Sequence, residues 1–169
     1  MTDLKKRLFA GLLALVLLCA PLSGCAAREA ERYDVLASTA PVRAMTAALL
    51  EGTGLNCGLV VTESVSCLHD YTLSVDDMKK IQRADVIAMN GAELEEFMED
   101  ALSASDAAVI DCSQGVELLE NREHHHEGED HDDHDHGHWD PHYWMDPERA
   151  GQMVANLQNG LAQADPEHA

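Results

Sequence analysis

Short hydrophobic runs alternate with amphipathic stretches along this chain. Four runs have the length and content of buried β-strands, and they span residues 33–38, 57–62, 85–90 and 107–111. The stretches between and after them have helical spacing, over residues 41–51, from 74 onward, 93–103 and 147–163. Strands that alternate with helices form βα units, so we predict an α/β fold with a parallel sheet and helices on both faces.

Polar residues at the expected helix starts support this prediction. Ser74 is followed three positions later by Asp77, a spacing that favours the first turn of a helix. Asp146 precedes a proline, a pair that is typical of a helix N-terminus. In the helix that starts at Ser74, the spacing puts four residues near one inward face, Val75, Met78, Ile81 and Gln82, with Lys79, Lys80 and Arg83 pointing outward.

The first residues have the three-part pattern of a secretion signal. Three basic residues at 5–7 precede an apolar run over 8–20 that is too short for a comfortable membrane span. Leu22-Ser23-Gly24-Cys25 then resembles the lipobox of bacterial lipoproteins. We therefore predict a lipoprotein-type signal peptide at 1–24, a lipid anchor on Cys25 and a tether at 25–32. The alternative is an ordinary secretory signal with an incidental cysteine.

Composition narrows the class of partner. The 169 residues include 31 acidic and 11 basic side chains, and the formal net charge is −20. A polyanion of this kind repels nucleic acid and attracts cations, so we expect no nucleic-acid partner. After Cys25 the chain has three cysteines, at 57, 67 and 112. Because three is odd, at least one is free or pairs with something outside this chain.

A tract over residues 123–140 combines seven histidines with eight carboxylates and has no Lys or Arg. Imidazole and carboxylate groups suit zinc and neighbouring divalent ions, whereas a tract with so few apolar side chains cannot bury a core. The alternatives are a solvated acidic loop and an expression tag, but the tract is interior and irregular. We predict auxiliary metal binding by its histidines His124, His125, His126, His131, His134, His136 and His138.

Two further histidines follow predicted strands. His69 comes after the second strand, and His142 lies in the loop after the fourth. In parallel sheets, ligands bind outside the carboxyl ends of the strands. The topology therefore predicts that His69 and His142 lie at the same edge of the sheet, although they are far apart in sequence.

Two motifs are specific enough to indicate a family. The first is His69-Asp70-Tyr71-Thr72-Leu73-Ser74, followed by IQRADVIAMNGAELEEF over residues 81–97. The second is DPHYWMDP over residues 140–147. Together with the lipobox and the His tract, these motifs resemble the substrate-binding proteins of bacterial zinc and manganese ABC importers. The resemblance covers essentially the whole predicted mature chain, and the D-P-H-x-W-x-D-P pattern is its most distinctive part.

The resemblance implies two α/β lobes, joined by a long helix, with the metal between them. His69 and His142 match two of the family's metal ligands. We expect Asp70 and Asp140 to accept hydrogen bonds from the ligand imidazoles. Zinc-type members often carry a His-rich acidic insertion before the second ligand, so the resemblance favours Zn²⁺ over Mn²⁺.

One departure from the family pattern bears on the site. The family's remaining ligands, a further His or Glu and a carboxylate, come from a second lobe, and this sequence stops at residue 169 before it. The resemblance implies an N-terminal lobe at 33–146, with its His-rich loop at 123–140. It also implies that residues 147–169 start a helix that leads to a missing C-terminal lobe. Some zinc members have an acidic residue before the first ligand, where this chain has Leu68.

The implied function is binding and delivery, not catalysis. The resemblance predicts a lipid-anchored protein on the extracytoplasmic face of a bacterial membrane that captures Zn²⁺ and passes it to an ABC importer permease. An alternative is a metal buffer, in which the His tract alone sequesters cations. A zinc hydrolase is less favoured, because the H-x-H-x-D stretch at 136–140 is followed by Pro141 where the H-x-H-x-D-H motif needs a sixth-position histidine.

Overall fold

A computed structural model describes residues 32–62, 68, 71–121 and 137–168. Its centre is a four-stranded sheet in the order β2-β1-β3-β4. Every neighbouring pair of strands is parallel, which confirms the predicted parallel sheet. The strands are shorter than predicted and span β1 (Val35–Ala37), β2 (Cys57–Leu59), β3 (Val86–Met89) and β4 (Ala108–Asp111).

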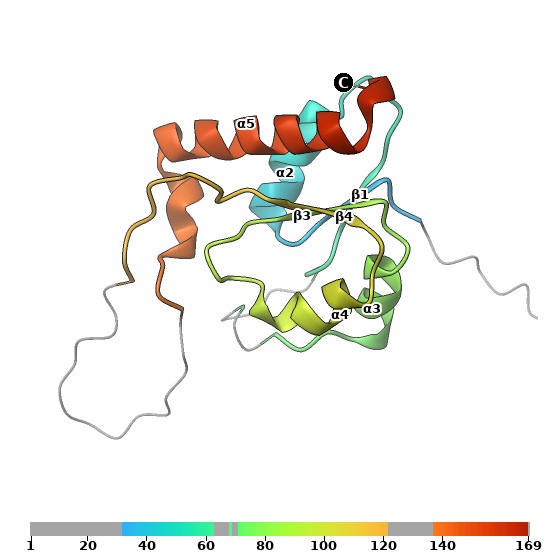
Figure 1. Cartoon of the computed structure of the whole chain (residues 1–169), viewed down its shortest axis with the longest axis horizontal. Helices are drawn as coiled ribbons and strands as arrows, with labels where there is room; N and C mark the ends of the chain where they lie inside the picture. Colours follow the sequence, from blue (N-terminus) through green and yellow to red (C-terminus); the bar gives the residue numbers. More distant parts are fainter. Residues whose placement is uncertain (1–31, 63–67, 69–70, 122–136, 169) are drawn as a thin grey trace, which may run out of the picture. The chain divides into compact units, whose positions relative to one another are not determined.

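Helices cover both faces of the sheet, as the alternating pattern predicts (Figure 1). One face carries α2 (Ala40–Leu49) and the long α5 (Pro147–Ala164), and the other carries α3 (Val75–Ile81) and α4 (Glu99–Ser103). Asp146 caps α5 by accepting hydrogen bonds from the backbone N–H groups of the second and third helical residues. The α/β fold class predicted from the sequence is therefore confirmed.

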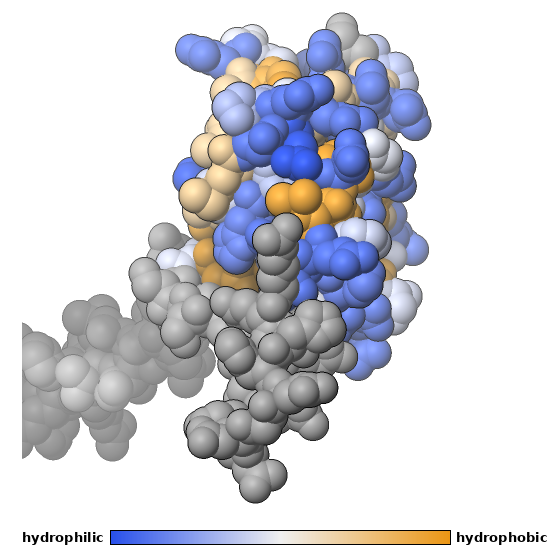
Figure 2. Space-filling model, turned by 90° about the vertical axis from the view of Figure 1, so that its left-hand side faces the viewer, coloured by the Kyte–Doolittle hydropathy of each residue, from blue (hydrophilic) through white to orange (hydrophobic). Residues whose placement is uncertain are grey.

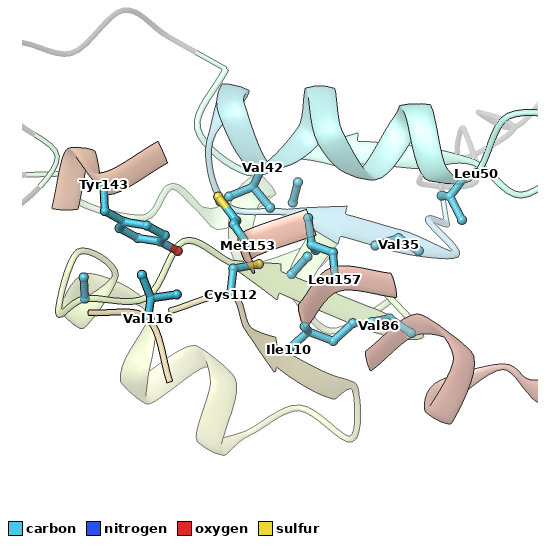
Figure 3. Packing of buried hydrophobic residues seen from close by; sticks show 13 residues of the cluster. Val35, Val42, Leu50, Val86, Ile110, Cys112, Val116, Tyr143, Met153 and Leu157 are labelled. Carbon is cyan, nitrogen blue, oxygen red and sulfur yellow. The ribbon is translucent and has the colours of Figure 1, made fainter. Parts of the chain in front are cut away.

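Two hydrophobic clusters hold these layers together, one on each face of the sheet. On the α2 and α5 face, Val42, Met153 and Leu157 pack against Val35 and other strand residues (Figure 3). The cluster on the opposite face includes Leu36, the next residue along β1. Burying one large aliphatic side chain stabilises a fold by about 1.5–3 kcal/mol, so both clusters contribute to a rigid sheet.

Helix α3 begins as predicted, but its buried face agrees with the prediction only in part. The Ser74 hydroxyl accepts from the Asp77 N–H and the Asp77 carboxylate accepts from the Ser74 N–H, which forms a capping box. Asp77 is buried and also accepts a hydrogen bond from Tyr71 Oη. Ile81, on the predicted inner face, is fully buried, so the prediction is right there. It is wrong for Val75 and Met78, which are 63% and 40% exposed, and for Gln82, which is also exposed, because the capping carboxylate of Asp77 is the side chain buried in the first turn.

The single helix predicted over residues 93–103 is also wrong in its first half. Ala92 and Glu93 have φ values of 57° and 65°, a left-handed conformation that no α-helix can contain. After this turn a short 3-10 helix, η2 (Glu96–Met98), leads into α4. In this arrangement the Glu95 side chain folds back to accept hydrogen bonds from the backbone N–H groups of Asn90 and Gly91 at the end of β3, and it also accepts one from the distant Ser38 hydroxyl.

Cys57 and Cys112 are free thiols in the described part of the chain. Cys67 lies outside the described residues, as do the predicted signal peptide and Cys25. Among the described residues, no helix has both the length and the apolar content needed to cross a membrane.

Candidate metal centre

The carboxyl ends of the strands meet at one edge of the sheet, where β1 leads into Ser38 and β3 into Asn90. The chain leaves β4, later returns to this edge and forms the 3-10 helix η4 (Pro141–Met145), which carries His142 (Figure 1). Asn90 Nδ2 donates a hydrogen bond to the Pro141 carbonyl, so the residue before His142 lies against the end of β3. The loop after the fourth strand thus returns His142 to the carboxyl edge.

His142 is paired with the carboxylate two residues before it. Asp140 Oδ1 accepts a hydrogen bond from the His142 backbone N–H at 3.0 Å and lies 2.9 Å from His142 Nδ1. These two contacts lower the pKa of Asp140, which favours the carboxylate form. The hydrogen bond from the His142 backbone N–H has the larger effect on this pKa, and the imidazole adds to it. A carboxylate at Nδ1 favours the tautomer with the proton on Nδ1, which leaves the Nε2 lone pair free for a metal. The His142 side chain is 65% exposed.

The first predicted ligand, His69, lies outside the described residues, together with Asp70. Its described neighbours, Leu68 and Tyr71, pack against the hydrophobic cluster under β1 and β3. The Tyr71 N–H donates to the Leu68 carbonyl at 3.0 Å. The two residues that flank the His69-Asp70 pair are therefore tied to each other and to the core.

The His tract enters and leaves the fold beside His142. The Asn121 N–H donates to the His138 carbonyl, and the Asp140 N–H donates to the Leu119 carbonyl, which joins the two ends by a short antiparallel bridge. The His138 N–H also donates to a Glu93 carboxylate oxygen at 2.6 Å. Of the predicted auxiliary ligands, the structure describes His138, which has an exposed side chain, and the other six lie outside the described residues.

Within the ranges that the structure describes, no group of three or more His, Cys, Asp or Glu side chains is arranged to hold a metal ion. His142 and its partner Asp140 therefore supply at most one metal-ligating imidazole and its acceptor. A tetrahedral zinc site normally takes four ligands, so a complete site would need donors beyond these residues.

Behind His142 lies a group of four residues that sequence reasoning did not single out as functional. We call Ser38, Asn90, Glu95 and Tyr143 the polar cluster; all four are buried. The Glu95 carboxylate accepts from Ser38 Oγ at 2.6 Å, from the Asn90 N–H at 2.7 Å and from the Gly91 N–H at 3.0 Å. Burial raises the pKa of Glu95, although these hydrogen bonds oppose the shift. Glu95 stands in a run of acidic residues, and nothing local in the sequence marks it as the buried one.

The surface at this edge is polar. Figure 2 looks onto the side that carries η4, and much of the described surface there is hydrophilic, with a hydrophobic patch in the middle and others toward one edge and the top. An exposed imidazole on such a surface is open to hydrated cations.

Comparison with known proteins identifies the family. Residues 35–169 match the family model described as "ZnuA: Zinc-uptake complex component A periplasmic". The chain belongs to this family. The zinc- and manganese-importer resemblance inferred from the two motifs is thereby confirmed at the level of the family.

Individual zinc-uptake proteins are similar over much of this chain. The high-affinity zinc uptake system protein ZnuA of Bacillus subtilis is 30% identical over 149 residues, which cover 86% of this chain and 46% of that protein. The zinc-binding protein AdcA of Streptococcus pyogenes is 31% identical over 114 residues, covering 60% of this chain and 22% of AdcA. The chain therefore spans about half or less of the length of these relatives.

Solved structures in the same class share the fold. The metal-dependent lipoprotein YcdH of Bacillus subtilis matches with a TM-score of 0.63 and 23% identity, over 80% of this chain and 46% of YcdH. Zn(II)-bound AdcA of Streptococcus pneumoniae matches with a TM-score of 0.64 and 21% identity, over 81% of this chain and 27% of AdcA. The Mn-bound periplasmic metal binding protein of Candidatus Liberibacter asiaticus matches with a TM-score of 0.63 and 24% identity, over 81% of this chain and 47% of that protein.

Proposed function

We propose that this chain is a zinc-binding component that captures Zn²⁺ outside the cytoplasm and delivers it to an ABC importer permease. His69 and His142 are the proposed ligands at the carboxyl edge of the sheet. Asp140 and Asp70 are the proposed acceptors that orient these imidazoles. The single observation that carries the proposal is the Asp140–His142 pair, because it holds an exposed imidazole with Nε2 free for a metal.

The sheet order supports a shared site for the two histidines. His69 follows β2, and the loop with His142 is tied to Asn90 at the end of β3. Only β1 lies between β2 and β3, so the ends of these strands are about 10 Å apart at an ordinary strand spacing of about 4.8 Å. Side chains from both loops can reach across such a gap. We infer that the remaining ligands lie outside the described residues, in line with relatives about twice as long.

Zinc is the favoured cargo, with Mn²⁺ as the weaker candidate, because neutral imidazole suits zinc whereas manganese prefers carboxylate, carbonyl and water ligands. Membership of a zinc-uptake family supports the same choice. In this proposal the His tract at 124–138 binds several ions loosely, and the two strand-edge histidines hold one ion at a fixed place. Residues 33–146 then form the metal-binding lobe, and the segment from residue 147 starts the connection to the rest of the protein.

A lipid on Cys25 is the proposed anchor at the extracytoplasmic face of the membrane. Mass spectrometry of the protein from membranes should find a lipidated N-terminus at residue 25. An unmodified mature N-terminus at another residue would remove this part of the proposal and leave zinc binding untouched.

Zinc calorimetry tests the fixed site. Deleting residues 124–138 should leave at most about one weak site in this chain, and adding His69→Ala and His142→Ala should abolish it. His168→Ala is a matched control, because His168 Nδ1 also lies 2.7 Å from an aspartate oxygen but on the distant end of the chain. If the deletion variant binds zinc equally well with and without the two histidines, they are not ligands.

A further inference from the structure

We propose that Asn90, fixed in place by Glu95, is a positioning residue for the metal ligand His142. This inference rests on the proposed function, in which His142 binds Zn²⁺. It assigns a role to the polar cluster, which lies behind the exposed imidazole and has no part in the ligand set. Asn90 is wholly buried, so its contribution is to the geometry of the site and not to direct contact with a hydrated ion.

Asn90 holds the chain on both sides of His142. Its Nδ2 donates to the carbonyl of Pro141 at 3.1 Å, and its own carbonyl accepts a hydrogen bond from Tyr143 Oη at 2.5 Å. The same Nδ2 also donates to the Gly91 carbonyl at 3.1 Å, and two carbonyl partners fix which end of the amide is the donor. The residues before and after His142 are thus both bonded to one residue at the end of β3.

Glu95 in turn holds Asn90. Its carboxylate accepts the backbone N–H groups of Asn90 and Gly91 and the hydroxyl of Ser38, so it connects the ends of β1 and β3. These three partners are neutral donors, and in the part of the chain that the structure describes, Glu95 takes part in none of the ion pairs. Keeping a buried carboxylate without a cation is costly unless its hydrogen bonds are satisfied. The hydrogen bonds that satisfy Glu95 also fix the backbone of Asn90 and Gly91, to which the His142 loop is bonded.

A fixed backbone at His142 matters for metal binding. The Asp140–His142 pair orients the ring, but both residues belong to the same loop. The position of the ring is fixed relative to the sheet only if the loop itself is bonded to the sheet. Asn90, at the end of β3, makes these bonds to the loop. A ligand that is ordered before the metal arrives loses less conformational entropy on binding, and outer partners of metal ligands typically change affinity by about tenfold or more.

The test uses the full chain and Zn²⁺ alone as the probe, with site-specific NMR of the histidine rings. Ring signals of His142 are assigned by comparison with His142→Gln. Tyr143→Phe removes one hydroxyl bond to the Asn90 carbonyl, and Asn90→Asp replaces the amide donor by a carboxylate that repels the Pro141 carbonyl. Circular dichroism and thermal unfolding establish that each variant is folded, and the milder Tyr143→Phe keeps the test valid if Asn90→Asp does not fold.

Two matched controls remove the same kinds of bond elsewhere. Asn156→Asp is the control for Asn90→Asp, because Asn156 Nδ2 also donates to two backbone carbonyls, those of Cys112 and Gln114. Ser105→Ala is the control for Tyr143→Phe, because Ser105 Oγ donates to the backbone carbonyl of Ile81. Neither control bond involves a residue of the polar cluster or of η4.

Without metal, the wild-type His142 ring should give the ¹⁵N signature of one tautomer, with a proton on Nδ1. Tyr143→Phe and Asn90→Asp should give averaged ring signals, and the Zn²⁺ concentration that half-saturates the His142 response should rise about tenfold. The controls should keep the wild-type tautomer and affinity. Folded variants with an unchanged tautomer and an unchanged Zn²⁺ response would overturn the positioning role while leaving His142 as a ligand. If wild-type His142 does not respond to Zn²⁺, the proposed function fails, and the metal-free ring signature alone then decides whether Asn90 positions His142.

Discussion

The two ends of the sheet stabilise the fold by different means. At the carboxyl end, Asn90 and Glu95 are buried and bonded to neutral groups. At the amino end, the polar contacts are exposed: Arg32 pairs with Asp85, with side chains 71% and 48% exposed, and Asp34 accepts from the backbone and side chain of Asn56.

This difference indicates where the geometry of the molecule is fixed. Exposed ion pairs contribute little to stability, because water screens them and long side chains lose entropy on pairing. A buried polar group costs free energy whenever one of its bonds is lost, so it tolerates few arrangements of the backbone around it. The carboxyl end is therefore the more rigid of the two, and among the described residues it is the end that carries His142.

The largest expected effect comes from adding a methyl group at the carboxyl end. Gly91 has a φ of +78°, and a Cβ there would lie 2.0 Å from Asp111 Oδ1 and 2.4 Å from Ser113 Oγ. Gly91→Ala should therefore cost about 3 kcal/mol of unfolding free energy, from left-handed strain together with overpacking. Gly52→Ala is the matched control, because Gly52 has a φ of +85° with open space around its Cβ position, and it should cost about 1 kcal/mol. Equal losses in urea unfolding would mean that the carboxyl end is not tightly packed at Gly91.

Replacing the buried carboxylate should have the next largest effect. In wild type the Glu95 carboxylate accepts hydrogen bonds from three donors. In Glu95→Gln the new amide N–H₂ group faces at least one of these donors, so a buried donor is left unsatisfied, which costs about 2 kcal/mol. Asp85→Asn alters the exposed pair with Arg32 at the other end and should leave the free energy of unfolding unchanged within error. Urea unfolding at pH 7 compares the two, and a larger loss for Asp85→Asn would mean that the exposed pair at the amino end stabilises the fold more than the buried carboxylate does.

The pH dependence of stability should separate Glu95 from a second buried carboxylate, Asp77. Burial raises the pKa of Glu95, so between the unfolded value of about 4.3 and the higher folded value the native state holds an extra proton. Stability from this group therefore falls as pH rises through that window. Burial also acts to raise the pKa of Asp77, but hydrogen bonds from Ser74, Lys80 and Tyr71 outweigh it and lower the pKa. Stability from Asp77 is thus present above about pH 3.9 and is lost as pH falls through its folded pKa.

Urea unfolding from pH 3 to pH 7 measures both effects. The difference in unfolding free energy between wild type and Glu95→Gln should shrink as pH rises above about 4.3, whereas the difference between wild type and Asp77→Asn should grow as pH rises from 3. Differences that change with pH in the same direction for both variants would show that one of the two pKa shifts has the wrong sign.

Local patterns predicted the fold well, because periodicity and capping depend on neighbours in the sequence. The four strands fall inside the predicted runs, and the capping positions Ser74 and Asp146 are where the spacing indicates. The exposure of Val75 and Met78 was missed, because it depends on how a capping carboxylate, Asp77, packs under the preceding loop. Hydrophobic spacing predicts the burial of Ile81 correctly, but it fails in the first turn, where a polar residue is the one that is buried.

The candidate site was predictable only in part for the same reason. His142 and Asp140 lie two residues apart, so a pairing between them can be expected from the sequence. Asn90 and Pro141 are 51 positions apart, and Ser38 and Glu95 are 57 apart. Contacts of that span have no local signal, and they become visible only when the strand order brings the ends of β1 and β3 together.

The smallest effect is expected from removing the hydroxyl that caps helix α3. Ser74→Ala removes the hydroxyl that accepts from the Asp77 N–H in the first turn of α3, and losing such a cap costs about 1 kcal/mol. Ser103→Ala is the control: its hydroxyl donates to the Asp100 carbonyl at an exposed helix end, and its loss should change stability by less than about 0.5 kcal/mol. Because the capped turn follows the His69 loop directly, Ser74→Ala should also weaken Zn²⁺ binding at the proposed site, though less than the Asn90 and Tyr143 variants. A cap variant as stable as Ser103→Ala would show that the Asp77 bonds to Tyr71 and Lys80 hold this turn without the Ser74 hydroxyl.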